Sequence, residues 1–376
     1  ERQARVGRKL LSTGNGRCNL SNLHAAPHHY HGRDPDFCRY ALEQFPVSST
    51  LAYFAALGLE TVTEPDGKIY PRSNMANSVL DVLRYALEHP RLHLLSGDGV
   101  ADLHKKGDTF AVTFLSGERY TNIDKVILAC GGAAGKKLGG SKSGYHLLSQ
   151  LGHSCTELLP SLTQIKTDPT YVKALKGVRA DAHVRLRKDG QTVQDSFGEV
   201  QFTDFGLSGP EAFTLSRAAA TGGGNQELAL DFFREYGDGA LLDMLQEKRA
   251  NLPALAAEDL FSGMLQSRLG KMIVKRAGLK YQTPLQSLND EQLLACVKIA
   301  KWFTLAVEGV MGFDSAQVTA GGVSTREFDS RTLESTISPG LFVCGEVLDI
   351  DGDCGGFNLQ WAWSSGFLAG RLGEGD

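Results

Sequence analysis

Cysteine is scarce in this 376-residue chain, and its seven copies never form a CxxC pair. An odd number of scattered thiols argues against a disulfide framework and a structural zinc site, and it favours a reducing cytoplasm. Long apolar runs are also lacking, because none approaches the ~18 residues that a membrane span needs. The chain does not open with a charged-then-apolar signal segment. We therefore expect a cytoplasmic protein with no membrane partner.

A strong charge of either sign is absent as well. The chain has 43 acidic and 39 basic residues, for a net charge of -4. This balance argues against a broad nucleic-acid surface, so we expect a small-molecule substrate and no nucleic-acid partner. The oligomeric state is not indicated. With 42% hydrophobic and 22% charged residues, the composition is that of a globular protein of two or three domains.

Glycine, in contrast, is abundant. It makes up 43 of the 376 residues, more than the usual ~7%, and without a period. Such an excess indicates tight turns and close approach of the backbone to a ligand. All ten histidines precede residue 184, and four of them lie between His24 and His31. No acidic or cysteine partner stands at ligand spacing there, so a solvated loop is favoured over a metal site, and no metal is assigned.

Periodicity predicts an α/β chain in five segments. Helices are expected over 74–88 and 144–151, and strands over 92–95, 110–115 and 126–130, with KVILAC buried on both faces. Residues 155–235 alternate like strands, 238–301 read as helices, and 303–310 return to a strand. The predicted segments are a ligand-binding domain (1–153 and 316–376), a β-rich insertion (154–236, with a return strand in 302–315) and a small helical domain (237–301).

The C-terminal segment is the most informative. Leu341–Cys344 reads as a short strand with Gly345 and Glu346 at its carboxyl end, where open α/β sheets bind ligands. Gly355-Gly356-Phe357-Asn358 then leads into an apolar helix. Glycines at a helix start leave backbone N–H groups bare, which suits a phosphate or the N1/C2-carbonyl edge of a flavin. An ordinary glycine-rich loop is an equally good interpretation of this run alone.

Two further segments point to an anionic ligand. Ala129-Cys130-Gly131-Gly132 repeats the strand-then-glycine pattern. The runs 7–9 and 14–19 place Arg8, Lys9 and Arg17 among glycines, as pyrophosphate binding requires, although a solvated basic loop is favoured in isolation. A nucleophilic role for Cys18 is disfavoured, since no histidine stands at a motif spacing that would activate it.

Seven segments together resemble the HI0933-like flavoprotein family, also called BaiN/YhiN-like or aminoacetone-oxidase-like, in the same order over essentially the whole chain. They are GRKLLSTGNGRCNLSN (7–22), GKIYPRSNMANSVLDVL (67–83), KVILACGG (125–132), GSKSGYHLLSQLGH (140–153), FTDFGLSGP (202–210), QVTAGGVS (317–324) and the tail 340–370.

The resemblance implies FAD in an interrupted Rossmann-type domain of the glutathione-reductase kind, with a β-rich and a small helical insertion. It implies a FAD-dependent oxidoreductase that passes a hydride between flavin N5 and an unidentified small molecule or NAD(P)H, with NADH or NADPH as a transient co-substrate. The GxGxxG βα unit that such a domain places before Glu1 is absent, so we expect a longer natural product. No catalytic residue is assigned.

The family's cofactor positions carry over residue by residue. Glu1 would hold the adenosine ribose and Val100 the adenine. Beside the pyrophosphate and the AMP half the resemblance places Arg8, Lys9, Ala129, Gly131 and Gly132. Along the flavin and its ribityl chain it places Arg17, Cys18, Asn19, Ser21, Asn22, Gly345, Glu346, Asp349, Gly355, Gly356, Phe357, Asn358 and Leu359.

Three alternatives stay open. The chain could be a flavin-carrying binding or sensor protein, or a degenerate relative that has lost FAD and acts as an interaction module. A tRNA-modifying flavoprotein is the remotest option, because the acidic balance weighs against it.

Overall fold

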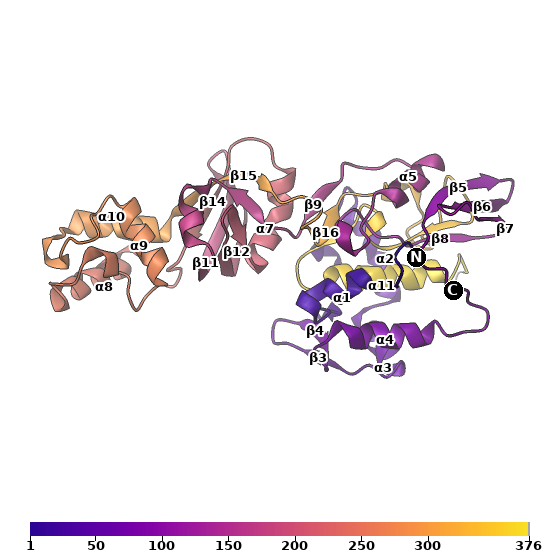
Figure 1. The fold of residues 1–376 in the computed structure, drawn as a ribbon, viewed down its shortest axis with the longest axis horizontal. Coiled ribbons are helices and arrows are strands. Elements are labelled where there is room, and N and C mark those ends of the chain that lie inside the picture. Colours follow the sequence, from indigo (N-terminus) through magenta and orange to yellow (C-terminus); the bar gives the residue numbers. More distant parts are fainter. Residues whose placement is uncertain (375–376) are drawn as a thin grey trace. The chain divides into compact units, whose positions relative to one another are not determined.

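The computed structural model describes residues 1–374, which fall into two compact units. The first unit is discontinuous: it combines Glu1–Ser161 with the C-terminal segment that begins at Phe313. The second unit is Leu162–Gly312. Both are mixtures of helices and strands (Figure 1). Within the described part of the chain, no helix has the length and apolar character to cross a bilayer.

Short sheets make up the β structure of the first unit. The parallel pair that positions the site is β8 (Val126–Leu128) with β17 (Leu341–Val343). The antiparallel pairings are β5 (Val100–Lys106) with β6 (Thr109–Phe114) and β7 (Arg119–Ile123), β1 (Ser21–Asn22) with β4 (Lys68–Pro71) and β3 (Thr61–Thr63), β2 (Tyr30–His31) with β18 (Asp351–Gly352), and β9 (Leu159–Ser161) with β16 (Val318–Ala320).

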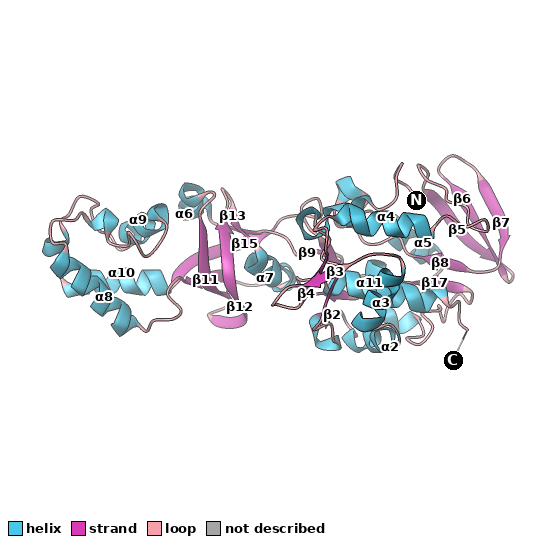
Figure 2. Ribbon diagram, turned by 90° about the horizontal axis from the view of Figure 1, so that it is seen from below, coloured by secondary structure: helices cyan, strands magenta, loops and turns pink. Residues whose placement is uncertain are grey.

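The helix α11 (Phe357–Gly370) lies in the middle of this unit (Figure 2). It is apolar on most sides and packs against α2 (Arg39–Gln44) and α3 (Val47–Ala56), as expected of a helix enclosed by its own domain. Its buried Gln360 donates to Thr50 at 2.9 Å and accepts from Ser21 at 2.6 Å. The remaining α-helices of the unit are α1 (Arg8–Ser12), α4 (Ala76–Ala86) and α5 (Ser143–Gln150).

Two expectations for the first unit are wrong. Residues 92–95 form no strand, and Leu92, Leu94 and Leu95 are exposed. KVILAC is not buried on both faces, because Ile127 is 41% exposed. Among the described residues β8 pairs with β17 alone, so its apolar run lacks the second neighbour that would enclose it. The expected helices at 74–88 and 144–151 are confirmed by α4 and α5.

A closed six-stranded barrel forms the centre of the second unit, in the order β10-β13-β12-β11-β14-β15. These strands are β10 (Ile165–Thr167), β11 (Arg179–Lys188), β12 (Gln191–Phe202), β13 (Gly206–Ser208), β14 (Gln226–Asp231) and β15 (Phe303–Val310). The alternation in β11 buries Ala182, Val184 and Leu186, as the pleat requires. Two helices accompany the strands, α6 (Pro169–Val172) and α7 (Pro210–Thr221).

The predicted helical texture of 238–301 is confirmed by α8 (Asp238–Asn251), α9 (Ser267–Arg276) and α10 (Asp290–Lys301). These helices lie in the connection between β14 and β15, which pair with each other. The barrel therefore closes only after the chain has passed through the helices.

We expect Asn289→Ala to lower the free energy of unfolding by about 1 kcal/mol. Asn289 begins α10 with a capping box: its side chain accepts from the Gln292 backbone, and the Gln292 side chain accepts from the Asn289 backbone. Urea denaturation followed by circular dichroism measures the loss. The exposed Asn251, the last residue of α8, provides the control Asn251→Ala. Equal stability of the two variants would contradict the assignment.

Candidate functional site

Two glycines lie at neighbouring strand ends with room above them. The parallel pairing aligns Leu128 of β8 with Val343 of β17, so the residues after each strand emerge at the same edge. Gly131 and Gly345 follow there, with φ of 70° and 74° and no atom within 4 Å of the position a Cβ would take. This edge can accept a ligand in direct contact with the backbone, as a dinucleotide requires.

Gly345 is held by two hydrogen bonds to side chains of α11. Its N–H donates to Ser365 Oγ at 3.0 Å, and its carbonyl accepts from Trp361 Nε1 at 3.1 Å. Gly132 is tightly packed instead, because an added Cβ would lie 2.5 Å from Thr319 Oγ1 and 2.6 Å from Glu346 Oε1. Gly345 is thus open to a ligand, whereas Gly132 makes room for the Glu346 carboxylate.

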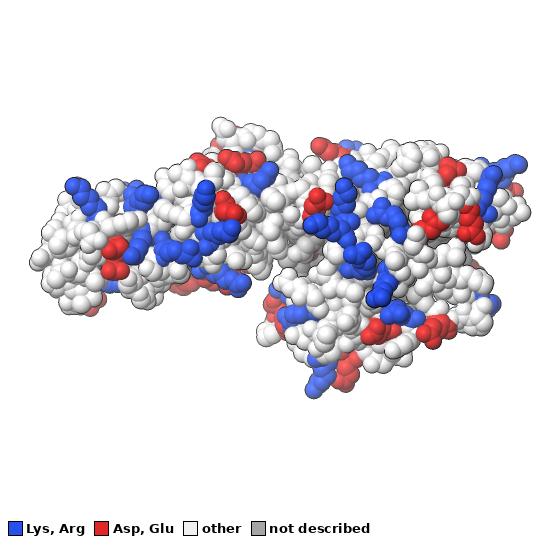
Figure 3. Space-filling view, in the orientation of Figure 1, with Lys and Arg blue, Asp and Glu red and all other residues white. Residues whose placement is uncertain are grey.

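The N-terminal helix α1 reaches this edge through Lys9. Lys9 Nζ lies 2.7 Å from Glu346 Oε2, while Glu346 Oε1 accepts from the Thr319 backbone at 2.8 Å. Helix α1 contacts the 3₁₀ turn Lys136–Leu138, which adds two exposed lysines, Lys136 and Lys137. Figure 3 shows lysines and arginines gathered on the face of the first unit that carries α1. A cluster of cations beside open glycine amides suits a pyrophosphate.

The start of α11 lies against the N-terminal GRCN segment. Gly356 is the N-cap residue of this helix, with φ 100°, and as a glycine it provides no side-chain cap. A Cβ on Gly356 would stand 2.4 Å from the Ser21 carbonyl, so only glycine lets β1 approach the helix. Asn22 Nδ2 donates to the Gly355 carbonyl at 2.9 Å. The first amides of α11 are left to bind an anion or a carbonyl.

Several predicted side chains are bonded within the protein. Asn358 binds both the N–H and the carbonyl of Gly352, at 2.8 and 2.7 Å, and so fixes the loop before α11. Ser21 donates to Gln360, and Phe357 is buried. These residues can shape the site, but only their backbone is left to reach a cofactor.

The other predicted residues are more dispersed. Arg17 pairs with Glu64 at 2.6 Å and lies over the Tyr70 ring at 3.8 Å. Asp349 is buried and accepts from the Arg33 backbone at 3.2 Å. The remaining residues are placed as follows. Glu1 is exposed and accepts from the Gln3 backbone, Arg8 donates to Gln3, Val100 begins β5, and Ala129 is exposed after β8. Leu359 packs against the apolar cluster that contains Leu20, and the buried Asn19 Oδ1 has no hydrogen-bond partner among the described residues.

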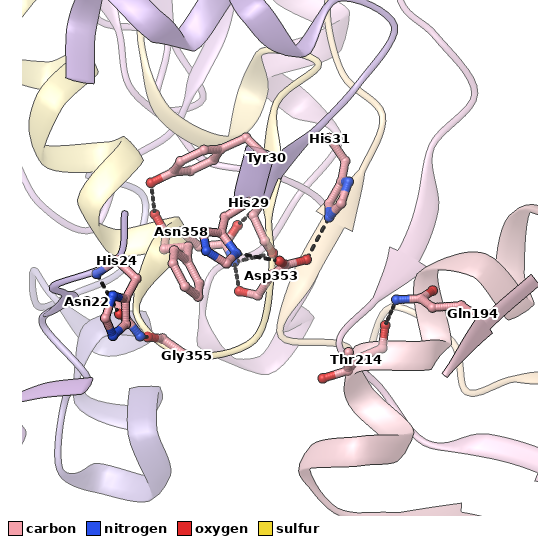
Figure 4. Close-up of polar contacts among 12 residues, drawn as sticks. Asn22, His24, His29, Tyr30, His31, Gln194, Thr214, Asp353, Gly355 and Asn358 are labelled. Carbon is pink, nitrogen blue, oxygen red and sulfur yellow. Dashed lines mark hydrogen bonds and ion pairs between the residues drawn. The ribbon is translucent and has the colours of Figure 1, made fainter. Parts of the chain in front are cut away.

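A histidine pair at the start of α11 was missed by sequence reasoning. β2 pairs with β18 and brings His29 and His31 to Asp353. His29 Nδ1 lies 2.9 Å from Asp353 Oδ2, and His31 Nε2 lies 2.7 Å from Asp353 Oδ1 (Figure 4). The expected solvated loop is therefore wrong for these two rings. No spacing signal could reveal a partner more than 320 positions away.

Electrostatics at Asp353 fit this pairing. Burial would raise the pKa of its carboxyl, but hydrogen bonds from His31 and His29 outweigh that effect and hold the pKa below its ordinary value. Over the described residues, no group of three or more His, Cys, Asp or Glu side chains is arranged to hold a metal ion.

We expect Cys18 to resist alkylation in the folded protein. It is fully buried, and burial raises the pKa of its thiol to about 11 despite the hydrogen bond to Thr13. At pH 8 only about 0.1% would be thiolate. Iodoacetamide labelling followed by mass spectrometry should modify the exposed Cys155 first, and Cys18 only after unfolding. Equal labelling of the two in the folded protein would contradict this expectation.

Comparison with known proteins supplies the family. The chain is 37% identical over 374 residues to a 3-dehydro-bile acid delta(4,6)-reductase of Clostridium scindens, covering 99% of this chain and 91% of that protein. It is 28% identical to a ribosomal RNA dihydrouridine synthase of Escherichia coli (97% and 88% covered) and 24% identical to one of Haemophilus influenzae (96% and 88% covered). The HI0933-like protein Rossmann domain model matches residues 1–372, and the chain belongs to this family.

Proposed function

We propose that this protein is a FAD-dependent reductase of carbon–carbon double bonds conjugated to a carbonyl group. The observation that carries the proposal is the pair of open glycines at the ends of β8 and β17, beside the bare start of α11. The names of the relatives supply the reaction class. Reduction of a 3-oxo-4,6-diene and conversion of uridine to dihydrouridine both saturate a C=C bond adjacent to a C=O group.

The described residues fit a bound FAD. Gly131 and Gly345 leave room for its backbone-contacting portion, and the cations of α1 and of the turn Lys136–Leu138 would face its anionic pyrophosphate. The first amides of α11 would hold the N1/C2-carbonyl edge of the ring, where negative charge accumulates on reduction. When bound, the flavin supplies a hydride acceptor and donor, with NADH or NADPH as the proposed source of electrons.

A small hydrophobic enone is the leading substrate class, because the relative that is 37% identical is a bile-acid reductase. The second candidate is a uracil base in RNA, which the two dihydrouridine synthases favour. The basic residues around α1 would serve either an RNA backbone or the cofactor's own pyrophosphate. The net charge of -4 favours the small molecule.

We expect the purified protein to bind FAD and, without oxygen, to oxidise more than one equivalent of NADPH or NADH only when 3-oxo-4,6-choladienoic acid is present. Anaerobic stopped-flow spectroscopy follows bleaching of the flavin by the nucleotide and its return on addition of the dienone. A protein that carries FAD but reduces uridine in RNA transcripts and not the dienone would support the second candidate. A protein that binds no flavin would overturn both.

Gly131→Ala should weaken FAD binding about tenfold, or ~1.4 kcal/mol. The new methyl group would occupy the space above the end of β8 that the cofactor needs. Gly107→Ala is the matched control, since Gly107 has φ 61° and open space around its Cβ position but lies in the β5–β6 turn. Both variants carry the strain of a left-handed alanine, ~1 kcal/mol. Equal FAD affinity, measured by fluorescence titration, would exclude Gly131 from the site.

A further inference from the structure

Two imidazole rings share one carboxylate at the start of α11. Asp353 accepts from His29 Nδ1 at 2.9 Å and from His31 Nε2 at 2.7 Å. The side chains of His29, His31 and Asp353 are 24%, 35% and 31% exposed. They are therefore held in place by the fold and are still open to solvent or to a bound molecule.

The cluster belongs to the same turn as the predicted flavin contacts. The His29 ring stacks on Phe357, the first residue of α11, with centroids 4.2 Å apart. The Asp353 N–H donates to the His29 carbonyl at 3.0 Å. Asn358, which clamps Gly352, also donates to the Asp353 carbonyl at 3.2 Å. His29 is therefore packed against the first residue of the helix whose amides we propose to hold the flavin ring.

Other titratable side chains in this region make contacts of their own. Tyr30 donates its hydroxyl to the Phe357 carbonyl at 3.0 Å, and burial raises the pKa of its phenol. Lys68 is bonded to Asp66 at 2.6 Å. His28 lies against the His29 ring, with centroids 4.2 Å apart. Since His29 binds Asp353 through Nδ1, its Nε2 is the ring atom left to face a substrate.

We propose that His29 is the proton donor of the reduction, an inference that rests on the proposed function. A reduced flavin, when bound, would supply a hydride and its two electrons for a C–H bond at the β-carbon of the enone, and the C=C π electrons would move to give an enolate. The Nε2–H bond of the His29 imidazolium then breaks, and its proton forms the second C–H bond at the α-carbon. Flavin is left oxidised and imidazole neutral, and solvent returns the proton.

Asp353 and His31 act as positioning residues. The ionised Asp353 carboxylate orients the His29 ring through Nδ1 and offers an ion-pair partner to its cationic form. His31, anchored on β2, holds the second carboxylate oxygen and so fixes the direction of Asp353. The arrangement is a general acid whose ring is oriented by a neighbouring carboxylate, as general acid–base sites commonly have.

The test compares His29→Ala, His29→Gln and Asp353→Asn with the control His104→Gln. His104 also pairs with an aspartate, Asp102 at 2.8 Å, but in the exposed β5–β6 hairpin. FAD content, thermal unfolding and anaerobic bleaching by NADPH are measured for each holoenzyme. Reoxidation of the flavin by 3-oxo-4,6-choladienoic acid is then measured separately.

We expect reoxidation by the dienone to slow about 100-fold or more in both His29 variants. FAD content and the NADPH step should change less than twofold, and the control should match the wild type. Free imidazole in the buffer should restore part of the rate in His29→Ala. When the reaction is run in D₂O, the wild type should add deuterium to one face of the α-carbon, and the His29 variants should add it to both faces. Wild-type reoxidation rates in both variants would overturn the proposal.

A second measurement needs no bound cofactor. Long-range ¹H–¹⁵N spectra show which ring nitrogen carries the proton. In spectra of the neutral rings we expect His29 to carry its proton at Nδ1 and His31 at Nε2, and both preferences to disappear in Asp353→Asn while His104 is unchanged. Unaltered spectra would overturn the positioning role. If the wild-type protein binds no flavin or does not reduce the dienone, the proposed function is wrong and this inference is wrong with it. If the wild type reduces the dienone and the His29 variants do so at the same rate, only this inference is wrong.

Discussion

The approach of β1 to the start of α11 is the contact on which the rest of the site depends. It requires glycine at 356, where a side chain would collide with the Ser21 carbonyl. Around it, Asn22 holds Gly355, Ser21 holds Gln360, and Trp363 Nε1 donates to the Leu20 carbonyl at 3.0 Å. Residues more than 300 positions apart are thereby packed together, and the N-cap residue Gly356 provides no side-chain cap for the helix.

The site combines rigidity with bare backbone. The side-chain amides of Asn358 and Gln360 are hydrogen-bonded to the surrounding chain, so they fix the loop and the helix. Gly131 and Gly345 do the opposite, since they present open backbone at the carboxyl ends of two parallel strands. This division suits a cofactor that is held mainly by amides, because its binding does not then depend on flexible side chains.

The histidines add a chemical group that the glycines cannot provide. Amides can stabilise negative charge, but protonation of an enolate needs a group that gives up a proton. The His29–Asp353–His31 cluster lies at the same turn, where its side chains are partly exposed and oriented by hydrogen bonds.

The second unit has a different construction: it is a closed barrel with three helices inserted between two of its paired strands.

The sequence by itself determined the family, the α/β character, the helix after Gly356 and the helical segment 238–301 between strand-like segments of the second unit, because these follow from local periodicity and from motifs in a fixed order. It did not reveal the helices α6 and α7 within 155–235. Only the tertiary structure decided which side chains face inward, the exposure of Ile127 on β8, and the pairing of His29 and His31 with Asp353. The physical reason is distance along the chain. Local patterns record backbone preference, whereas a contact across 320 positions arises only when β2 and β18 pair.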